Sequence, residues 1–145
     1  MSKNILYLLR ILQHIGKVQY INAKFNSLDD LFESNEQTEF DAILIRLTQI
    51  VENASKLDQE IKIIYDSVQW QKIKDFRNLI VHEYTGINKQ AVFDILKIDL
   101  ITLKVYIEEI IINEINLENQ YRTALQKLST NAFYKFVDFN KILEK

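Results

Sequence analysis

Eight consecutive residues near the middle of the chain bring together a guanidinium, an amide, an imidazole, a carboxylate and a phenol. They are Arg77-Asn78-Leu79-Ile80-Val81-His82-Glu83-Tyr84. An imidazole with a pKa near neutrality can accept or donate a proton at pH 7. A guanidinium can bind a phosphate through two parallel hydrogen bonds and stabilise negative charge on its oxygens. The segment therefore combines acid–base and phosphate-binding groups.

Together, Arg77 and His82 supply the types of group that are needed to cleave a phosphodiester bond in RNA. The imidazole would remove the proton of a 2′-hydroxyl, that oxygen would attack the adjacent phosphorus, and the guanidinium would stabilise the pentavalent intermediate. RNA carries its own nucleophile, so this chemistry needs no metal ion and no cofactor, and the sequence contains no cluster of carboxylates and histidines at metal-ligand spacing. The residues alone also allow a structural interpretation, in which Arg77 ends a helix and pairs with Asp75 or Glu83.

The spacing of the two groups constrains their geometry. On a straight α-helix, Arg77 and Tyr84 lie nearly on one face, whereas His82 points about 140° away from Arg77. Such a helix would not bring Arg77 and His82 together. Either the helix unwinds near Val81, or a second subunit completes the site.

Apolar residues at three- and four-residue spacing predict helices around this segment. They are predicted over 3–23, 38–57, 68–84 and 88–113. Ser2 and Ser27 are candidate N-caps, Asn88 opens the fourth long helix, and Gly86 is expected to stop the third. The stretch 58–68 fits either a short helix or an extended strand.

The last thirty or so residues are expected to form a separate layer. Apolar residues follow one helical stripe from Leu117 to Leu128, a break follows at 129–131, and aromatic residues from Phe133 to Phe139 predict a final helix. That helix either covers the core or docks a partner. The fold class is therefore all-α, an antiparallel four-helix bundle over 1–113 with additional C-terminal helices over 114–145 packed on the same domain.

Composition excludes several other classes of protein. The chain of 145 residues has no Pro, two Gly and no Cys, which disfavours β-sandwiches, phosphate-loop α/β folds, disulfide scaffolds and thiolate zinc sites. No apolar run reaches the ~20 residues of a membrane span, and the first residues do not resemble a signal peptide, so we expect a cytoplasmic protein that does not contact membranes. The net charge of −2 implies that any RNA contact is local, for example a basic groove on an acidic body.

The segment from Trp70 to Tyr84 resembles the signature of HepT-like ribonuclease toxins. Arg77, His82 and Tyr84 match the R-x4-H-x-Y pattern of the HEPN superfamily. A polar residue directly after the arginine, here Asn78, is also common in the family. Residues 5–15 and 42–57 resemble its first two helices, although Val51 replaces the usual Gly before Glu52. The resemblance covers roughly residues 3–113 and does not extend to the C-terminal residues.

The resemblance implies a role for each matching residue. Arg77 and His82 match the catalytic pair of the family, and Asn78 matches the polar residue that assists it. Tyr84 matches the tyrosine that a cognate MntA-type nucleotidyltransferase antitoxin can AMPylate, which would block RNA by charge and bulk. The family forms homodimers in which two motifs face a shared cleft. Some members of the family are binding modules. The alternative function is therefore a catalytically silent module that binds its nucleotidyltransferase partner or a nucleotide. A third possibility is a purely structural four-helix protein.

Other residues have simpler interpretations. Lys72, Lys74 and Lys89 flank the motif and form either a basic rim that attracts RNA or a solvated face. His14 is expected to be an ordinary surface or groove residue, because no acidic or hydroxyl partner stands at helical spacing. Trp70 is expected to anchor its helix in the core.

Overall fold

A computed structural model describes residues 3–82 and 86–144, with only the backbone described at 80–82 and 86. Its regular elements are α1 (Lys3–Asn22), α2 (Leu28–Glu33), α3 (Thr38–Ser55), α4 (Gln59–Ile64), α5 (Trp70–Ile80), β1 (Val81–His82), β2 (Gly86–Ile87), α6 (Lys89–Asp94), α7 (Leu100–Leu117), α8 (Asn119–Leu128) and α9 (Phe139–Leu143). Short helical turns η1 (Ser34–Gln37), η2 (Ile95–Asp99) and η3 (Ala132–Tyr134) join them. The predicted all-α class is confirmed.

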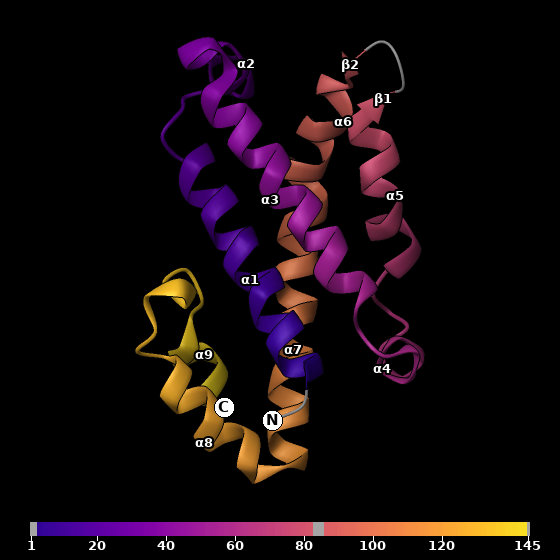
Figure 1. Cartoon of the computed structure of the whole chain (residues 1–145), viewed down its shortest axis with the longest axis vertical. Coiled ribbons are helices and arrows are strands. Elements are labelled where there is room, and N and C mark those ends of the chain that lie inside the picture. The colour runs from indigo at the N-terminus through magenta and orange to yellow at the C-terminus, as the bar shows by residue number, and fades with distance from the viewer. Residues whose placement is uncertain (1–2, 83–85, 145) are drawn as a thin grey trace.

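The four long helices α1, α3, α5 and α7 run alternately up and down in an antiparallel bundle (Figure 1). Helix α1 packs against α3 and α7, and α3 packs against α5 on its other side. The predicted stripe of α1, which includes Ile5, Leu8 and Ile15, is buried in the core together with Phe40 of α3 and Phe76 of α5. The apolar periodicity therefore identified the inward faces correctly.

Several helix boundaries follow from local capping. The side chain of Ser27 accepts a hydrogen bond from the backbone N–H of Asp30 at the start of α2, and the side chain of Asn88 accepts one from Ala91 at the start of α6. Both caps were predicted. The ambiguous stretch 58–68 contains the short helix α4, which follows Asp58, and its Ile63 and Ile64 are exposed.

The fourth predicted helix keeps one direction, but the type of helix changes along it. Helix α6 passes through a π-helical turn, η2, directly into α7, and α7 continues to Leu117. Its predicted inward residues, such as Val92, Leu103 and Ile107, are buried. The proposed boundary at residue 113 falls within α7, and the division of the chain into 1–113 and 114–145 stays a prediction.

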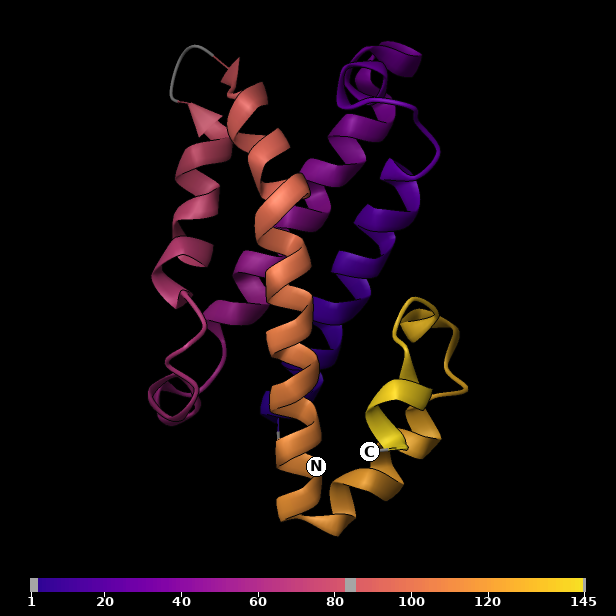
Figure 2. The same ribbon diagram turned by 180° about the vertical axis from the view of Figure 1, so that it is seen from behind.

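The C-terminal segment folds back against the bundle (Figure 2). Helix α8 turns back from the end of α7, and α9 packs on both α7 and α8. The prediction of one aromatic helix from Phe133 was wrong, because the segment forms the 3-10 turn η3 after a break and then the short helix α9. Asn131 caps η3 and Asp138 caps α9, so each cap interrupts what would otherwise be a continuous helix.

Close approach to α1 fixes this segment in place. The side chain of Gln13 accepts a hydrogen bond of 2.8 Å from the backbone N–H of Phe136. A Cβ atom added at Gly16 would lie 2.6 Å from Cβ and 2.7 Å from the carbonyl oxygen of Phe136. Only glycine therefore allows α1 to approach the backbone of the C-terminal segment this closely.

No helix in the described ranges 3–82 and 86–144 is both long enough and apolar enough to cross a membrane.

Candidate functional site

The backbone of the central motif changes from helix to strand between its two key residues. Arg77 and Asn78 lie on the last turns of α5, and both are exposed. The helix ends at Ile80, and the next two residues form β1, in which His82 pairs with Gly86 of β2. The side chain of His82 and the whole of Tyr84 lie outside the described residues.

This backbone corrects two expectations from the sequence. The third long helix does not continue to Tyr84, and Gly86 does not terminate a helix but belongs to an antiparallel strand pair. Of the two ways considered for bringing Arg77 and His82 together, the backbone shows that the helix ends just before Val81. The spacing argument for a straight helix therefore does not apply to His82.

Arg77 faces an acidic residue of the neighbouring helix. Its Nη1 atom lies 3.9 Å from Oε1 of Glu52 on α3, and the two side chains are 67% and 45% exposed. At this distance and exposure, the ion pair contributes roughly 0–1 kcal/mol to stability. The sequence suggested Asp75 as one partner of Arg77, but Asp75 accepts a hydrogen bond from Gln71 instead. Glu52 was not predicted as a partner, because no short-range spacing links α3 to α5.

Lys74 lies one turn before Arg77 and Asn78 on α5, so the three residues share one side of that helix. Lys74 also lines a hollow of about 430 Å³ between α3, α4 and α5, opposite Lys62. Burial lowers the pKa of Lys62, and the positive charge of Lys74 lowers it further. Lys62 and Lys74 therefore place two positive charges beside this hollow, and the role of Lys74 in a basic rim stays a prediction.

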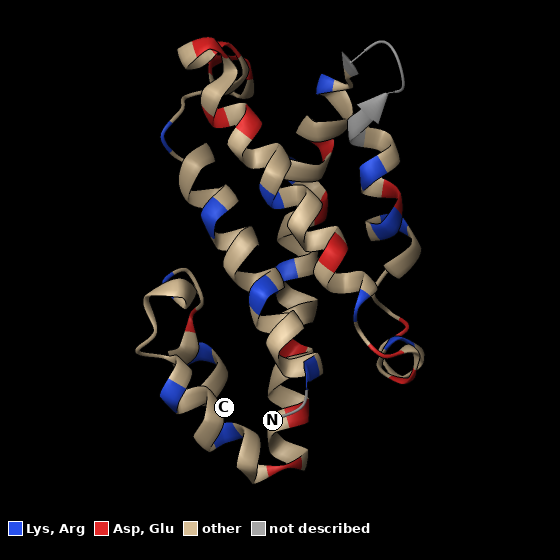
Figure 3. Cartoon of the chain, viewed as in Figure 1, with Lys and Arg blue, Asp and Glu red and all other residues tan. Residues whose placement is uncertain are grey.

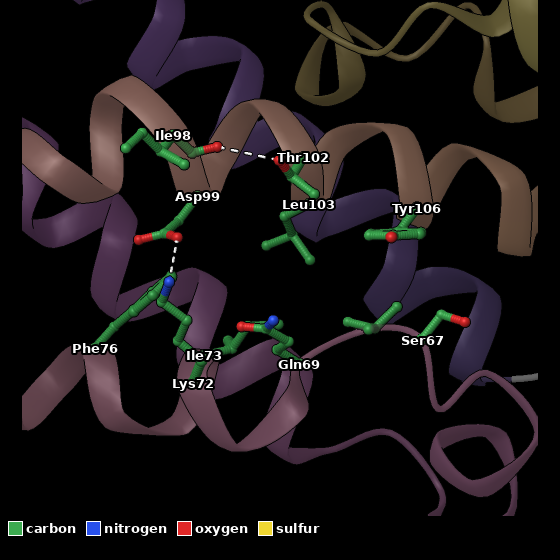
Figure 4. Close-up of a pocket in the computed structure, with 11 residues that line it drawn as sticks. Ser67, Gln69, Lys72, Ile73, Phe76, Ile98, Asp99, Thr102, Leu103 and Tyr106 are labelled. Carbon is green, nitrogen blue, oxygen red and sulfur yellow. Dashed lines mark hydrogen bonds and ion pairs between the residues drawn. The ribbon is translucent and has the colours of Figure 1, made fainter.

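The other two predicted rim lysines are engaged elsewhere. Nζ of Lys72 lies 2.7 Å from Oδ1 of Asp99, across a pocket of about 210 Å³ between α5 and α7 (Figure 4). Nζ of Lys89 lies 3.4 Å from Oδ1 of Asp29 and 4.9 Å from the centre of the Phe32 ring. Both ammonium groups are paired with carboxylates while remaining 49% and 42% exposed, and their role in attracting RNA stays a prediction.

Trp70 and His14 complete the residues that the sequence singled out. Trp70 is partly buried against the core and donates a hydrogen bond from Nε1 to the carbonyl oxygen of Tyr65, as expected for an anchor. His14 is only 5% exposed and lines a hollow between α1 and α3, so of the two expected positions, surface or groove, the structure shows the groove. Its Nδ1 atom lies 3.4 Å from Nη1 of Arg46 on α3. Sequence spacing could not reveal this contact, because the two residues lie on different helices.

Comparison with known proteins places this geometry in a family. The sequence model of the family described as "Ribonuclease HepT-like" matches residues 11–110. A protein of Methanocaldococcus jannaschii named "Gamma-glutamylcyclotransferase and putative RNase" is 27% identical over 139 residues, which are 96% of this chain and 59% of that protein. No solved structure matches the chain. The motif on α5, the helical bundle and the extent of the family match together show that this chain belongs to the HepT-like ribonuclease family.

Proposed function

We propose that this chain is an endoribonuclease toxin that cleaves RNA through Arg77 and His82, with Asn78 as an assisting polar group. The observation that carries the proposal is the placement of Arg77. Its guanidinium is exposed near the end of α5, four residues before the start of the strand that contains His82. Membership of the family and a relative whose name includes RNase support the same chemistry.

The proposed reaction is an internal displacement at phosphorus. The imidazole of His82 takes the proton of the 2′-hydroxyl, and the 2′-oxygen bonds to phosphorus. The bond from phosphorus to the 5′-oxygen breaks as that oxygen receives the proton from the imidazolium. The products are a 2′,3′-cyclic phosphate and a free 5′-hydroxyl. Arg77 would stabilise charge on the phosphoryl oxygens, and the amide of Asn78 would hydrogen-bond to the same group. Every bond change uses groups of the RNA and the protein.

We further propose that the working form is a homodimer in which two motifs share one cleft. Apolar side chains near the motif support this. Leu79, two residues before β1, and Ile87, the last residue of β2, are each 42% exposed. Burying such residues against a second copy would remove apolar surface from water next to Arg77.

The neutralising partner is proposed to be an MntA-type nucleotidyltransferase that AMPylates Tyr84. An added AMP would add a negatively charged phosphate and a bulky nucleoside to the motif, which would repel and displace RNA. Mass spectrometry tests this step after the chain is incubated with ATP, Mg²⁺ and a nucleotidyltransferase encoded by a neighbouring gene. We expect one or more AMP additions, and none in Tyr84→Phe. AMP addition to Tyr84→Phe at the level of the parent chain would overturn the assignment.

The main test measures cleavage and growth together. Expression of the parent chain alone should slow growth and fragment cellular RNA, whereas Arg77→Ala and His82→Ala should do neither. Lys104→Ala, a change on α7 away from the motif, is the matched control and should behave as the parent. If both motif variants cleave RNA as fast as the parent, the proposal is wrong.

The ion pair of Arg77 with Glu52 favours one alternative function. A guanidinium held by a carboxylate could serve as an anchor in a catalytically silent module that binds the nucleotidyltransferase or a nucleotide. This alternative predicts tight binding of the partner by a chain that cuts no RNA. It also predicts that Glu52→Gln weakens partner binding as much as Arg77→Ala does.

A further inference from the structure

A cationic groove lies on the other side of α3 from Arg77. A hollow of about 650 Å³ opens between α1 and α3, and a second of about 370 Å³ continues beside η3. Arg46 and Phe133 line both, so the two form one surface, which we call the α1–α3 groove. Its cations come from α1, from α3 and its C-cap residue, and from the segment after η3. They are Arg10, Lys17, Arg46, Lys56 and Lys135.

The positive charge of the groove is not neutralised locally. No Asp or Glu lines either hollow, and α1 contains none over its whole length (Figure 3). Arg10 and Lys17 are seven residues apart on α1, so they lie on one face of that helix. Within the described part of the chain, none of the five cations forms an ion pair. Such a concentration is notable on a chain with a net charge of −2.

Aromatic rings lie beside several of these cations. Arg10 and Lys56 lie 5.9 Å and 5.8 Å from the centre of the same Tyr7 ring. The Tyr20 and Phe136 rings are 5.2 Å apart at the other end. The ring-bearing side chains of Tyr20 and Phe133 remain 53% and 50% exposed. Cations that can bind phosphates beside exposed rings on which bases can stack are the typical surface for single-stranded nucleic acid.

His14 holds Arg46 in this groove. The pKa of His14 is lowered to about 4 by burial and by the charges of Arg46, Arg10 and Lys17. The imidazole is therefore neutral at pH 7, and its Nδ1 can accept a hydrogen bond from the guanidinium 3.4 Å away. Arg46 is thus oriented by a neutral acceptor, which leaves its full charge available to an anion.

The groove is also adjacent to the proposed catalytic arginine. Asn53 lines the groove, and its neighbour in sequence, Glu52, contacts Arg77. Helix α3 packs against α1 on one side and α5 on the other, so its outer surface connects the groove to the end of α5. A strand bound in the groove would need to cross only α3 to reach Arg77.

We propose that the α1–α3 groove binds the phosphates and unstacked bases of single-stranded RNA and directs the strand across α3 toward Arg77. This inference rests on the proposed ribonuclease function. It adds a substrate-binding surface formed by α1, α3 and the C-terminal segment, which contains no residue of the R-x4-H motif.

Binding can be measured without cleavage by placing all variants in an Arg77→Ala chain. The probe is a fluorescent oligouridylate, titrated by anisotropy at several salt concentrations. The groove variant combines Arg10→Gln, Arg46→Gln and Lys56→Gln. The matched control combines Lys97→Gln, Lys104→Gln and Lys127→Gln, which removes the same charge from residues that do not line the groove.

We expect the groove variant to lose about tenfold or more in affinity, and the slope of log K against log[salt] to fall by roughly 2, since about three phosphate contacts are lost. The control should change affinity by less than about threefold, because only long-range attraction is reduced. Equal losses in the two variants, or none in either, would overturn the proposal. If the triple variant fails to fold, Lys56→Gln and Lys135→Gln, both at exposed residues, replace it.

Competitors identify the ligand. Unlabelled single-stranded RNA should displace the probe, whereas a duplex of equal length and polyglutamate of equal charge should compete weakly. Full displacement by polyglutamate, or by AMP at the same phosphate concentration, would contradict an RNA groove and indicate a site for acidic protein or mononucleotide. NMR of His14 gives an independent readout, because a phosphate bound at Arg46 should raise the pKa of His14 above its free value of about 4. An unchanged pKa at saturating RNA would place the RNA elsewhere.

Failure of this inference is distinguishable from failure of the proposed function. If the parent chain binds RNA through the groove but does not cleave it, the proposed ribonuclease function is wrong and the RNA-binding groove stands. If a chain with its groove cations replaced cleaves subsaturating RNA as fast as the parent, the groove proposal is wrong and the ribonuclease function stands.

Discussion

Nη1 of Arg77 on α5 lies 3.9 Å from Oε1 of Glu52 on α3. Both side chains remain accessible to solvent, so the contact orients the guanidinium without burying it. An oriented but exposed cation can bind a phosphate without first being released from the protein interior. The same contact sets Arg77 next to the residues of α3 that border the cationic groove.

Replacement of Arg77 should separate activity from stability. Because the ion pair is exposed, Arg77→Ala should change the free energy of unfolding by less than about 1 kcal/mol in urea titrations. Cleavage of an RNA oligonucleotide should fall by about 10²–10³-fold, the effect of removing one group that stabilises developing charge. Lys104→Ala, on α7, is a control for loss of a positive charge and should keep full cleavage activity. A large loss of stability in Arg77→Ala would mean that Arg77 acts mainly in folding.

Replacement of Glu52 should have the opposite effect on substrate binding. Glu52→Gln removes a negative charge beside Arg77, so RNA should bind more tightly and KM should fall, while unfolding changes by less than about 1 kcal/mol. Steady-state kinetics at low salt, where the charge effect is largest, checks this. A higher KM would instead show that Glu52 is needed to position Arg77.

The buried histidine predicts a specific pH dependence of stability. His14 has a pKa lowered from 6.5 to about 4 in the folded chain, so the unfolded chain binds more protons between these values. Stability from this group is therefore complete above about pH 6.5 and is lost as the pH falls toward 4, by roughly 2–3 kcal/mol. His14→Gln keeps a polar side chain that does not titrate, and the difference in unfolding free energy between parent and variant should shrink over this range. A difference that stays constant with pH would contradict the assigned pKa.

Gly16 should be intolerant of a side chain although it lies inside a helix. Alanine normally stabilises a helix by ~1 kcal/mol relative to glycine. Here the new Cβ would meet backbone atoms of Phe136, so the C-terminal segment must move, at a cost of about 1–3 kcal/mol. We expect Gly16→Ala to be net destabilising in urea unfolding and to weaken RNA binding in the groove, whose wall this segment forms. A stabilised variant would show that the close contact is easily relaxed.

A buried carboxylate should make the docking of α9 depend on one lysine. Nζ of Lys141 lies 2.9 Å from Oε1 of Glu108, whose side chain is 3% exposed, whereas that of Lys141 is 44% exposed. Its hydrogen bond with Glu108, and the charge of that residue, raise the pKa of Lys141. This contribution should therefore be present below the ordinary lysine pKa and disappear as the pH rises through the raised value.

Lys141→Met should leave the Glu108 carboxylate unpaired and destabilise the chain by about 1–2 kcal/mol, less than for a fully buried pair because solvent screens the lysine. The double variant with Glu108→Gln should recover part of this loss, which thermal unfolding of the four chains of a double-mutant cycle measures. If Lys141→Met is as stable as the parent, the pair does not hold α9.

Much of the fold could be predicted because it depends on residues close together in the chain. The spacing of apolar residues identified α1, α3 and the inward side of α6 and α7, since a helix that packs on a core must repeat its apolar residues every three or four positions. Ser27 and Asn88 were recognised as caps because a cap and its target are separated by only three residues. Arg77 and His82 were singled out because their spacing resembles the R-x4-H-x-Y pattern of the family, and their catalytic role stays a proposal.

The tertiary structure decided what depends on residues far apart. The end of α5 at Ile80 coincides with pairing of Val81 and His82 to β2, which helical periodicity could not reveal. The pairing of Arg77 with Glu52, the burial of His14 and the joining of cations from α1, α3 and the C-terminal segment all arise where separate elements pack. Amino-acid types and local spacing therefore determined the helices and the candidate reactive groups, whereas packing determined which charges became neighbours, because electrostatic contacts depend on distance in space rather than along the chain.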